Sequence, residues 1–169
     1  MSGPSRSGAP PAGPVRSFDF PTVSADALDN GLRIRSVRVG RLPIVTAILV
    51  LDAGEGLLDD SRAGTAVLTG DCLEGGTAQR TGVELAEALE TIGAGLSVKT
   101  GWDSTTVSLT CLADRLDEAI GLLSEVILQP SFPDDEVTRI REQRLAAIRQ
   151  REMDPAGIAT TASRRLTYR

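Results

Sequence analysis

Histidine is absent from the 169-residue sequence, and Lys99 is its single lysine. Without an imidazole, the chain lacks the usual general base of serine and cysteine triads and the commonest ligand of catalytic zinc. Aromatic residues make up 3% of the chain, and no apolar run approaches the ~20 residues of a membrane-spanning helix. The sequence therefore excludes the common hydrolytic triads and predicts no membrane partner.

Charge and cysteine content narrow the class of protein further. The formal net charge of −5 argues against a nucleic-acid partner, because phosphate binding requires a basic surface. Cys72 and Cys111 have no metal-ligand spacing and are interpreted as small buried apolar residues. Their free thiols favour a reducing compartment, and no apolar segment follows the first arginines. We expect a cytoplasmic protein, with the periplasm as the alternative.

The length predicts one folded domain preceded by a tail. Residues 1–17 are mostly Gly, Pro, Ser and Ala, a composition that cannot bury enough apolar surface to order itself. Residues 18–169 are long enough for one core of the usual ~100 to 150 residues. We therefore expect a disordered tail and a single domain.

The first part of that domain carries strand signals. Asn30-Gly31 predicts a hairpin with a type I′ turn, after which residues 32–39 alternate apolar and polar side chains. This alternation places Leu32 and Ile34 toward a core and the arginines toward water. Residues 44–51 are almost continuously apolar, which predicts a central strand covered on both faces.

Periodicity and capping signals place the remaining elements. Helices are expected over residues 62–73, 81–93, from 116 to Pro130, 133–153 and 156–169, and a second hairpin over 96–100 and 105–111. Thr81 and Glu84 match a capping box at the start of the second helix. The order predicts an α+β fold, a two-layer sandwich in which helices lie mainly on one face of a mixed, largely antiparallel sheet.

A set of short motifs resembles the N-terminal domain of the M16 peptidases, the family of pitrilysin, insulinase and the mitochondrial processing peptidase. The motifs are Leu28-Asp-Asn-Gly-Leu-Arg33, Pro43, Asp52-Ala-Gly-Glu55, Glu74-Gly-Gly-Thr77, Leu89-Glu-Thr-Ile-Gly-Ala-Gly95, Gln129-Pro-Ser-Phe-Pro133 and Asp154-Pro155. The resemblance implies the LuxS/MPP-like metallohydrolase fold. It also implies that the domain is incomplete at its C-terminus, because the sequence ends within what corresponds to the last third of the first of the two homologous domains of a family subunit.

The resemblance also locates the family's catalytic positions. Active members carry His-x-x-Glu-His on the helix that reads GTAVLTGDCLEGGT here, where two imidazoles hold zinc and the glutamate activates water. Those positions are Val67, Gly70 and Asp71. The third ligand lies in a Glu-Glu-Ile-like run that reads Ala146-Ala147-Ile148 in this chain. The resemblance therefore implies that the helix is retained in the fold without the catalytic side chains. It also implies that this chain binds no metal.

From the resemblance we expect a non-catalytic subunit that shapes a peptide chamber. Its partner would be an HxxEH-bearing M16 subunit that holds the zinc, or a second copy of the chain, and its substrates would be extended peptides. Trp102 and Asp103, at the second hairpin, are candidate contacts to substrate or partner.

Two other readings stay open. One is a catalytically dead peptide-binding or scaffold domain that holds peptides by strand addition at a sheet edge. The other is a divergent metal or thiol enzyme that uses Asp71, Cys72, Glu74 or Asp103, against which a solvated helix end is the simpler interpretation.

Overall fold

The computed structural model describes residues 13, 19–40 and 42–167, with the side chain of residue 165 left out. The expected tail, residues 1–17, lies outside the described residues except for position 13. The chain divides into two compact units, residues 1–42 and 43–169, and each is described by itself.

The first unit contains an antiparallel hairpin of β1 (Val23–Ala27) and β2 (Arg33–Val37). The hairpin was predicted correctly, but the type I′ turn was wrong. Gly31 has φ +87°, whereas Asn30 is not among the described residues with positive φ, and a type I′ turn needs both. Asn30 acts through its side chain instead, since its Oδ1 accepts the Leu32 amide at 3.0 Å.

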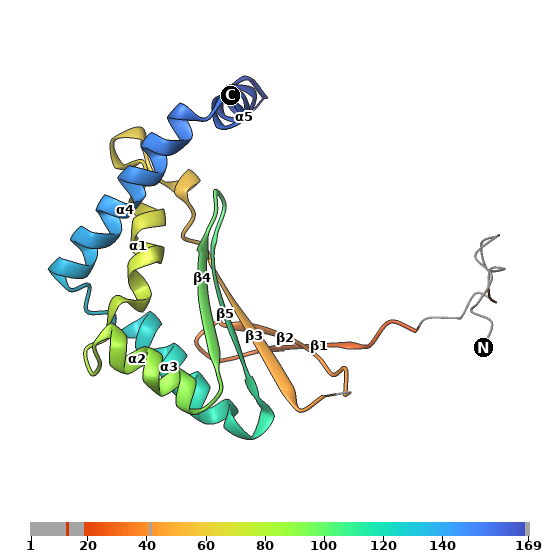
Figure 1. Ribbon diagram of the computed structural model, residues 1–169. Coiled ribbons are helices and arrows are strands. Elements are labelled where there is room, and N and C mark those ends of the chain that lie inside the picture. Colours follow the sequence, from red (N-terminus) through yellow and green to blue (C-terminus); the bar gives the residue numbers. More distant parts are fainter. Residues whose placement is uncertain (1–12, 14–18, 41, 168–169) are drawn as a thin grey trace, which may run out of the picture. The chain divides into compact units, whose positions relative to one another are not determined.

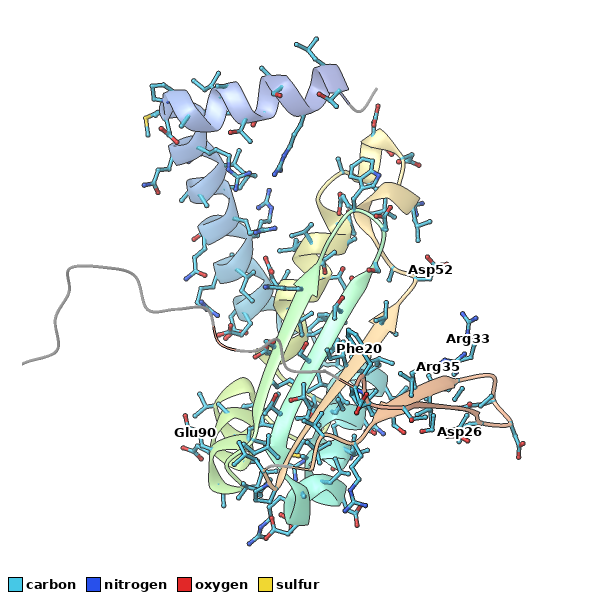
Figure 2. The ribbon with its side chains drawn as sticks, turned by 90° about the vertical axis from the view of Figure 1, so that its right-hand side faces the viewer. Phe20, Asp26, Arg33, Arg35, Asp52 and Glu90 are labelled. Carbon is cyan, nitrogen blue, oxygen red and sulfur yellow. The ribbon has the colours of Figure 1, made fainter. Side chains whose placement is uncertain are left out.

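The two faces of this hairpin do not separate into buried and wet sides. Arg33 and Arg35 are exposed and project to one side, as Figure 2 shows. Leu32 and Ile34, which were expected to face a core, are also exposed, at 44% and 37%. The alternation is present, but no residue of β1 or β2 is buried.

The second unit is built on a three-stranded antiparallel sheet. Its strands are β3 (Ile44–Leu51), β4 (Gly95–Thr100) and β5 (Thr105–Leu112), in the order β3-β5-β4. Apolar β3 is therefore an edge strand among the described residues, and the prediction of a central strand covered on both faces was wrong. Ile44, Ile48 and Val50 are 50 to 64% exposed because no element of this unit covers their face.

Helices occupy the predicted segments. They are α1 (Thr65–Cys72), α2 (Gly82–Thr91), α3 (Leu116–Leu128), α4 (Asp134–Met153) and α5 (Pro155–Thr167). Single 3-10 turns are η1 (Glu55–Leu57), η2 (Asp60–Arg62), η3 (Leu73–Gly75) and η4 (Ala113–Arg115). The capping box predicted at Thr81 and Glu84 is present.

The core lies between the sheet and the helices on one of its faces (Figure 1). Val107 and Leu109 of β5 are fully buried, and they belong to one cluster with Leu85 of α2 and Val126 of α3. The α+β class with helices on one face is confirmed. Every strand pair among the described residues is antiparallel. None of the described helices has the length and apolar character to cross a membrane.

Candidate functional site

The helix singled out from the sequence, α1, packs directly on β4. At Gly70 the approach is so close that an added Cβ would lie 2.2 Å from Thr100 Oγ1 and 3.6 Å from Val98 Cγ1. Thr100 Oγ1 is held in place by Thr105 Oγ1 at 3.0 Å, which in turn donates to the Ala53 carbonyl at 2.7 Å. A threonine of the sheet therefore fills the space that a side chain at position 70 would need.

An ion pair joins α1 to α4 at the next residue. Arg144 Nε lies 3.0 Å from Asp71 Oδ2, with side-chain exposures of 46% and 36%. Arg144 is one helical turn before Ala147, so this contact brings the turn that carries Ala146 and Ala147 beside Asp71. The two segments that the sequence analysis connected are therefore adjacent in space, as Figure 1 shows for α1 and α4.

The residues at this junction do not fit a metal ion. Val67, Gly70, Ala146 and Ala147 have no side-chain lone pair, and the carboxylate of Asp71 already pairs with a guanidinium. Within the part of the chain that the structure describes, no three His, Cys, Asp or Glu side chains gather as a metal site would require. No zinc-dependent step is therefore assigned to this chain.

The two thiols offer no activated nucleophile. Cys72 and Cys111 are both 2% exposed and free. Burial raises the pKa of the Cys72 thiol, and the negative charges of Asp71 and Glu136 raise it further, against a smaller opposing effect of Arg139. Burial likewise raises the pKa of Cys111, with a further contribution from Asp114. A nucleophilic cysteine needs the opposite shift.

Glu74, the last acidic residue of the motif segment, lies in the 3-10 turn η3 that follows α1. Desolvation raises the pKa of its carboxyl, although part of the side chain remains exposed. A hydrogen bond from the backbone amide of Val98 opposes that rise.

A cavity of about 900 Å³ opens beside this helix end, between α2 and the start of α4. Its lining carboxylates are Asp71, Glu74, Glu84, Glu87, Glu90, Asp135 and Glu136. Two arginines, Arg80 and Arg139, also line it, and they pair with Glu125 and Glu136. The cavity is therefore strongly acidic, which suits a cationic group better than an anionic one.

Trp102 and Asp103 form the tip of the β4–β5 hairpin. Trp102 is 72% exposed, and its indole lies against Gly56, where an added Cβ would be 2.6 Å from Nε1. Backbone bonds from Glu55 N to Gly101 O (3.0 Å) and from Gly56 N to Trp102 O (2.8 Å) tie the tip to the loop before α1. The tryptophan is thus exposed and held by a fixed backbone.

Three residues at this site were not recognised from the sequence. Arg144 is one of several arginines of α4 that the sequence analysis did not single out, and Thr100 was expected only as a strand residue. Glu55 belongs to a motif of the resemblance, but its role is structural, since its carboxylate accepts the amides of Gly64 and Val67 and so caps α1. Each of these contacts joins residues distant in sequence, which single-element patterns do not reveal.

Comparison with known proteins gives a consistent picture. The family model described as insulinase (peptidase family M16) matches residues 40–169. The mitochondrial-processing peptidase subunit beta of Caenorhabditis elegans is 28% identical over 81% of the chain. The non-peptidase homolog YmxG of Helicobacter pylori is 32% identical over 67% of it.

A solved structure extends the similarity to three dimensions. The crystal structure of a peptidase M16 inactive domain from Pseudomonas fluorescens superimposes with a TM-score of 0.78 at 28% identity over 82% of this chain. The chain spans 34% of that structure, 29% of the nematode subunit and 26% of the bacterial homolog. It therefore corresponds to about a quarter to a third of the length of the proteins it matches.

Proposed function

This chain belongs to the insulinase family of peptidases, family M16, and from that premise we propose that it is a non-catalytic member of a peptidase complex. In this proposal it pairs with an HxxEH-bearing, zinc-holding subunit and supplies part of the wall of a chamber for extended peptides. A homo-oligomer is the second possible assembly. The chain itself performs no hydrolysis.

One observation carries the proposal. The two helices that hold the metal in active members, here α1 and α4, are packed together, yet the contact between them is the Asp71–Arg144 ion pair. A scaffold that retains its helix packing without metal donors fits a structural role in an assembly better than a peptidase. Two matched proteins described as a non-peptidase homolog and an inactive domain support the same reading.

The experiment is reconstitution with an active homologue. The chain and an HxxEH-bearing M16 protein encoded in the same genome are coexpressed with a tag on one of them, and cleavage of a quenched fluorescent peptide is measured for each protein and for the mixture. We expect copurification and a rise in peptide cleavage above the sum of the separate rates. No complex and no change in rate would contradict the proposal.

A control identifies the source of activity. Substituting alanine for the HxxEH glutamate of the partner should abolish cleavage by the mixture, whereas Asp71→Asn in this chain should leave the cleavage rate unchanged. A loss of activity with the Asp71 variant would instead indicate chemistry in this chain.

The free edge of β4 favours a second candidate function, a peptide-binding or scaffold domain that acts without a peptidase. Among the described residues β4 pairs only with β5, so the backbone groups of its other side are open to an added strand. Binding of extended peptides by the isolated chain, with no effect on the activity of any M16 partner, would favour this function over the first.

A further inference from the structure

The turn between β4 and β5 and the loop before α1 form an apolar surface with an acidic border, which we call the tryptophan patch. Trp102, the one tryptophan of the sequence, and Leu57 are its apolar side chains, and Leu57 is 61% exposed. Residues 52–60 and 101–104 contain five acidic residues and no lysine or arginine. The exposed carboxylates are those of Asp52, Asp59, Asp60 and Asp103. None of these four forms an ion pair with another described residue.

Two glycines fix the position of Trp102. A Cβ added at Gly54 would lie 2.2 Å from the Trp102 carbonyl oxygen, and one added at Gly56 would lie 2.6 Å from the indole nitrogen. The loop and the turn therefore pack together without room for a side chain at either position. A side chain that is already ordered before it binds loses little conformational entropy on binding, and an exposed tryptophan is a typical anchor of a protein interface.

The second half of α4 together with α5 carries the opposite charge, and we call residues 141–167 the arginine patch. This segment contains six arginines and three acidic residues. Ile148, Ile158 and Leu166 are 48%, 52% and 79% exposed, so the segment also presents apolar side chains. The exposed arginines that form no ion pair with another described residue are Arg141, Arg149, Arg151 and Arg164.

The two patches complement each other rather than themselves. Both lie at the same end of the second unit, as Figure 1 shows for α5 and the turn that joins β4 and β5. Two tryptophan patches in contact bring carboxylates together, and two arginine patches bring guanidinium groups together. Only the contact of one patch with the other pairs unlike charges. A two-fold dimer forms this contact twice, because each copy contributes both patches.

We propose that two copies of this chain associate about a two-fold axis, with the tryptophan patch of each copy seated on the arginine patch of the other. The inference specifies the contact of the homo-oligomer named above as the second possible assembly, and it rests on that assembly. In this dimer Trp102 packs against the exposed aliphatic side chains of α4 and α5. The carboxylates around it face the arginines of the second copy, which fixes the partner and the orientation.

The first test removes the anchor. Every protein carries Ile48→Lys, which disfavours association through the exposed face of β3, and sedimentation equilibrium gives the dissociation constant of the dimer. Trp102→Ala should raise this constant about tenfold or more, as the loss of an interface anchor does. Val83→Ala, at a residue 69% exposed on α2, should leave it unchanged. A parent protein that stays monomeric, or equal constants for the two alanine variants, overturns the inference.

The second test exchanges the charges. One variant, Asp59→Arg with Asp60→Arg, places two arginines in the tryptophan patch, and the other, Arg149→Glu with Arg151→Glu, places two glutamates in the arginine patch. Each variant alone should dimerise about tenfold more weakly than the parent, because both of its contacts gain like charges. An equimolar mixture should recover the dimer, since both contacts between the two variants pair unlike charges. A mixture that associates no better than its separate components overturns the inference.

The mixture also separates the possible failures. Recovery of the dimer from two weakened variants shows that both are folded, and circular dichroism checks each of them alone. If α5 closes over the tryptophan patch of its own copy instead, the parent and the mixture stay monomeric, and the two-fold contact is overturned. That result leaves the pairing with an HxxEH-bearing subunit to its own coexpression assay, which requires no homodimer.

Discussion

Gly70, the position that the family resemblance predicts for the water-activating glutamate, lies directly against Thr100. The hydroxyl of Thr100 occupies the position beside Gly70 and is fixed by Thr105. The neighbouring strand therefore occupies the space beside position 70. A side chain introduced at this position would meet Thr100.

Substitution of Gly70 by alanine tests this packing. Alanine favours a helix over glycine by about 1 kcal/mol, but the contact with Thr100 should cost about 1–3 kcal/mol, so we expect net destabilisation in urea unfolding followed by circular dichroism. Thr100→Ala should relieve much of the cost in the double variant. Thr100→Val, which keeps a methyl group in place of the hydroxyl, should not. A Gly70→Ala protein more stable than wild type would refute the close approach.

The buried cysteines give a second prediction at this scale. Since burial raises the pKa of Cys72 and Cys111, less thiolate is present at pH 8 than for a free cysteine. We expect native protein to react with a disulfide reagent far more slowly than urea-unfolded protein, in which both thiols should react. Rapid labelling of the native protein at either cysteine would instead support the hypothesis of a divergent thiol enzyme.

At the scale of single elements, α1 depends on a carboxylate from outside the helix. Gly64 precedes it with no side-chain cap of its own, and Glu55 accepts the amides of Gly64 and Val67 instead. A capping interaction of this kind is typically worth ~1 kcal/mol. The loop before α1 thus caps the helix through Glu55, and its backbone amides bond to the turn that carries Trp102.

Glu55→Ala should therefore loosen the start of α1. We expect a loss of about 1 kcal/mol in unfolding free energy and faster amide exchange at Gly64 and Val67, because both donors lose their acceptor. Glu55→Gln should have a smaller effect, since its amide oxygen remains an acceptor. Asp60→Ala, which removes a nearby carboxylate that accepts no hydrogen bond from α1 among the described residues, should behave as wild type. Equal effects of Asp60→Ala and Glu55→Ala would contradict the assignment of Glu55 as the cap of α1.

Elements were predictable from the sequence because their signals are local. The period of α3, the capping box of α2 and the glycine-rich end of α1 all lie within about four residues of the feature that they specify. Which strands and helices lie next to one another was less predictable. The apolar composition of β3 suggested burial on both faces, but burial depends on which distant segment lies alongside, and in its own unit β3 is an edge with one exposed face.

At the candidate site, too, positions could be predicted from the sequence, whereas contacts between distant residues could not. The resemblance aligned Val67, Gly70 and Asp71 with the metal-site positions of the family one by one, and this assignment stays a prediction. The Asp71–Arg144 ion pair could not be predicted, since Arg144 is one arginine among several on α4 and nothing in its spacing singles it out for Asp71. Pairs that join residues tens of positions apart require the three-dimensional structure.

At the scale of the whole molecule, the second unit exposes an apolar strip. Ile44, Ile48 and Val50 are half-exposed or more along β3, which carries no charged residue to discourage pairing. A face of this kind favours association, with a second copy or with a partner. This agrees with a chain that works within an assembly, and it can be tested without knowing the partner.

Ile48→Lys should reduce self-association. We expect the weight-average mass of the wild type to rise with concentration in sedimentation, and the substituted protein to stay closer to a monomer, because burying an unpaired ammonium in an apolar contact is costly. Val83→Lys adds the same charge at a residue 69% exposed on α2, so it should associate as the wild type does. A wild type that remains monomeric at every concentration, or equal effects of the two lysines, would show that the β3 face does not drive association.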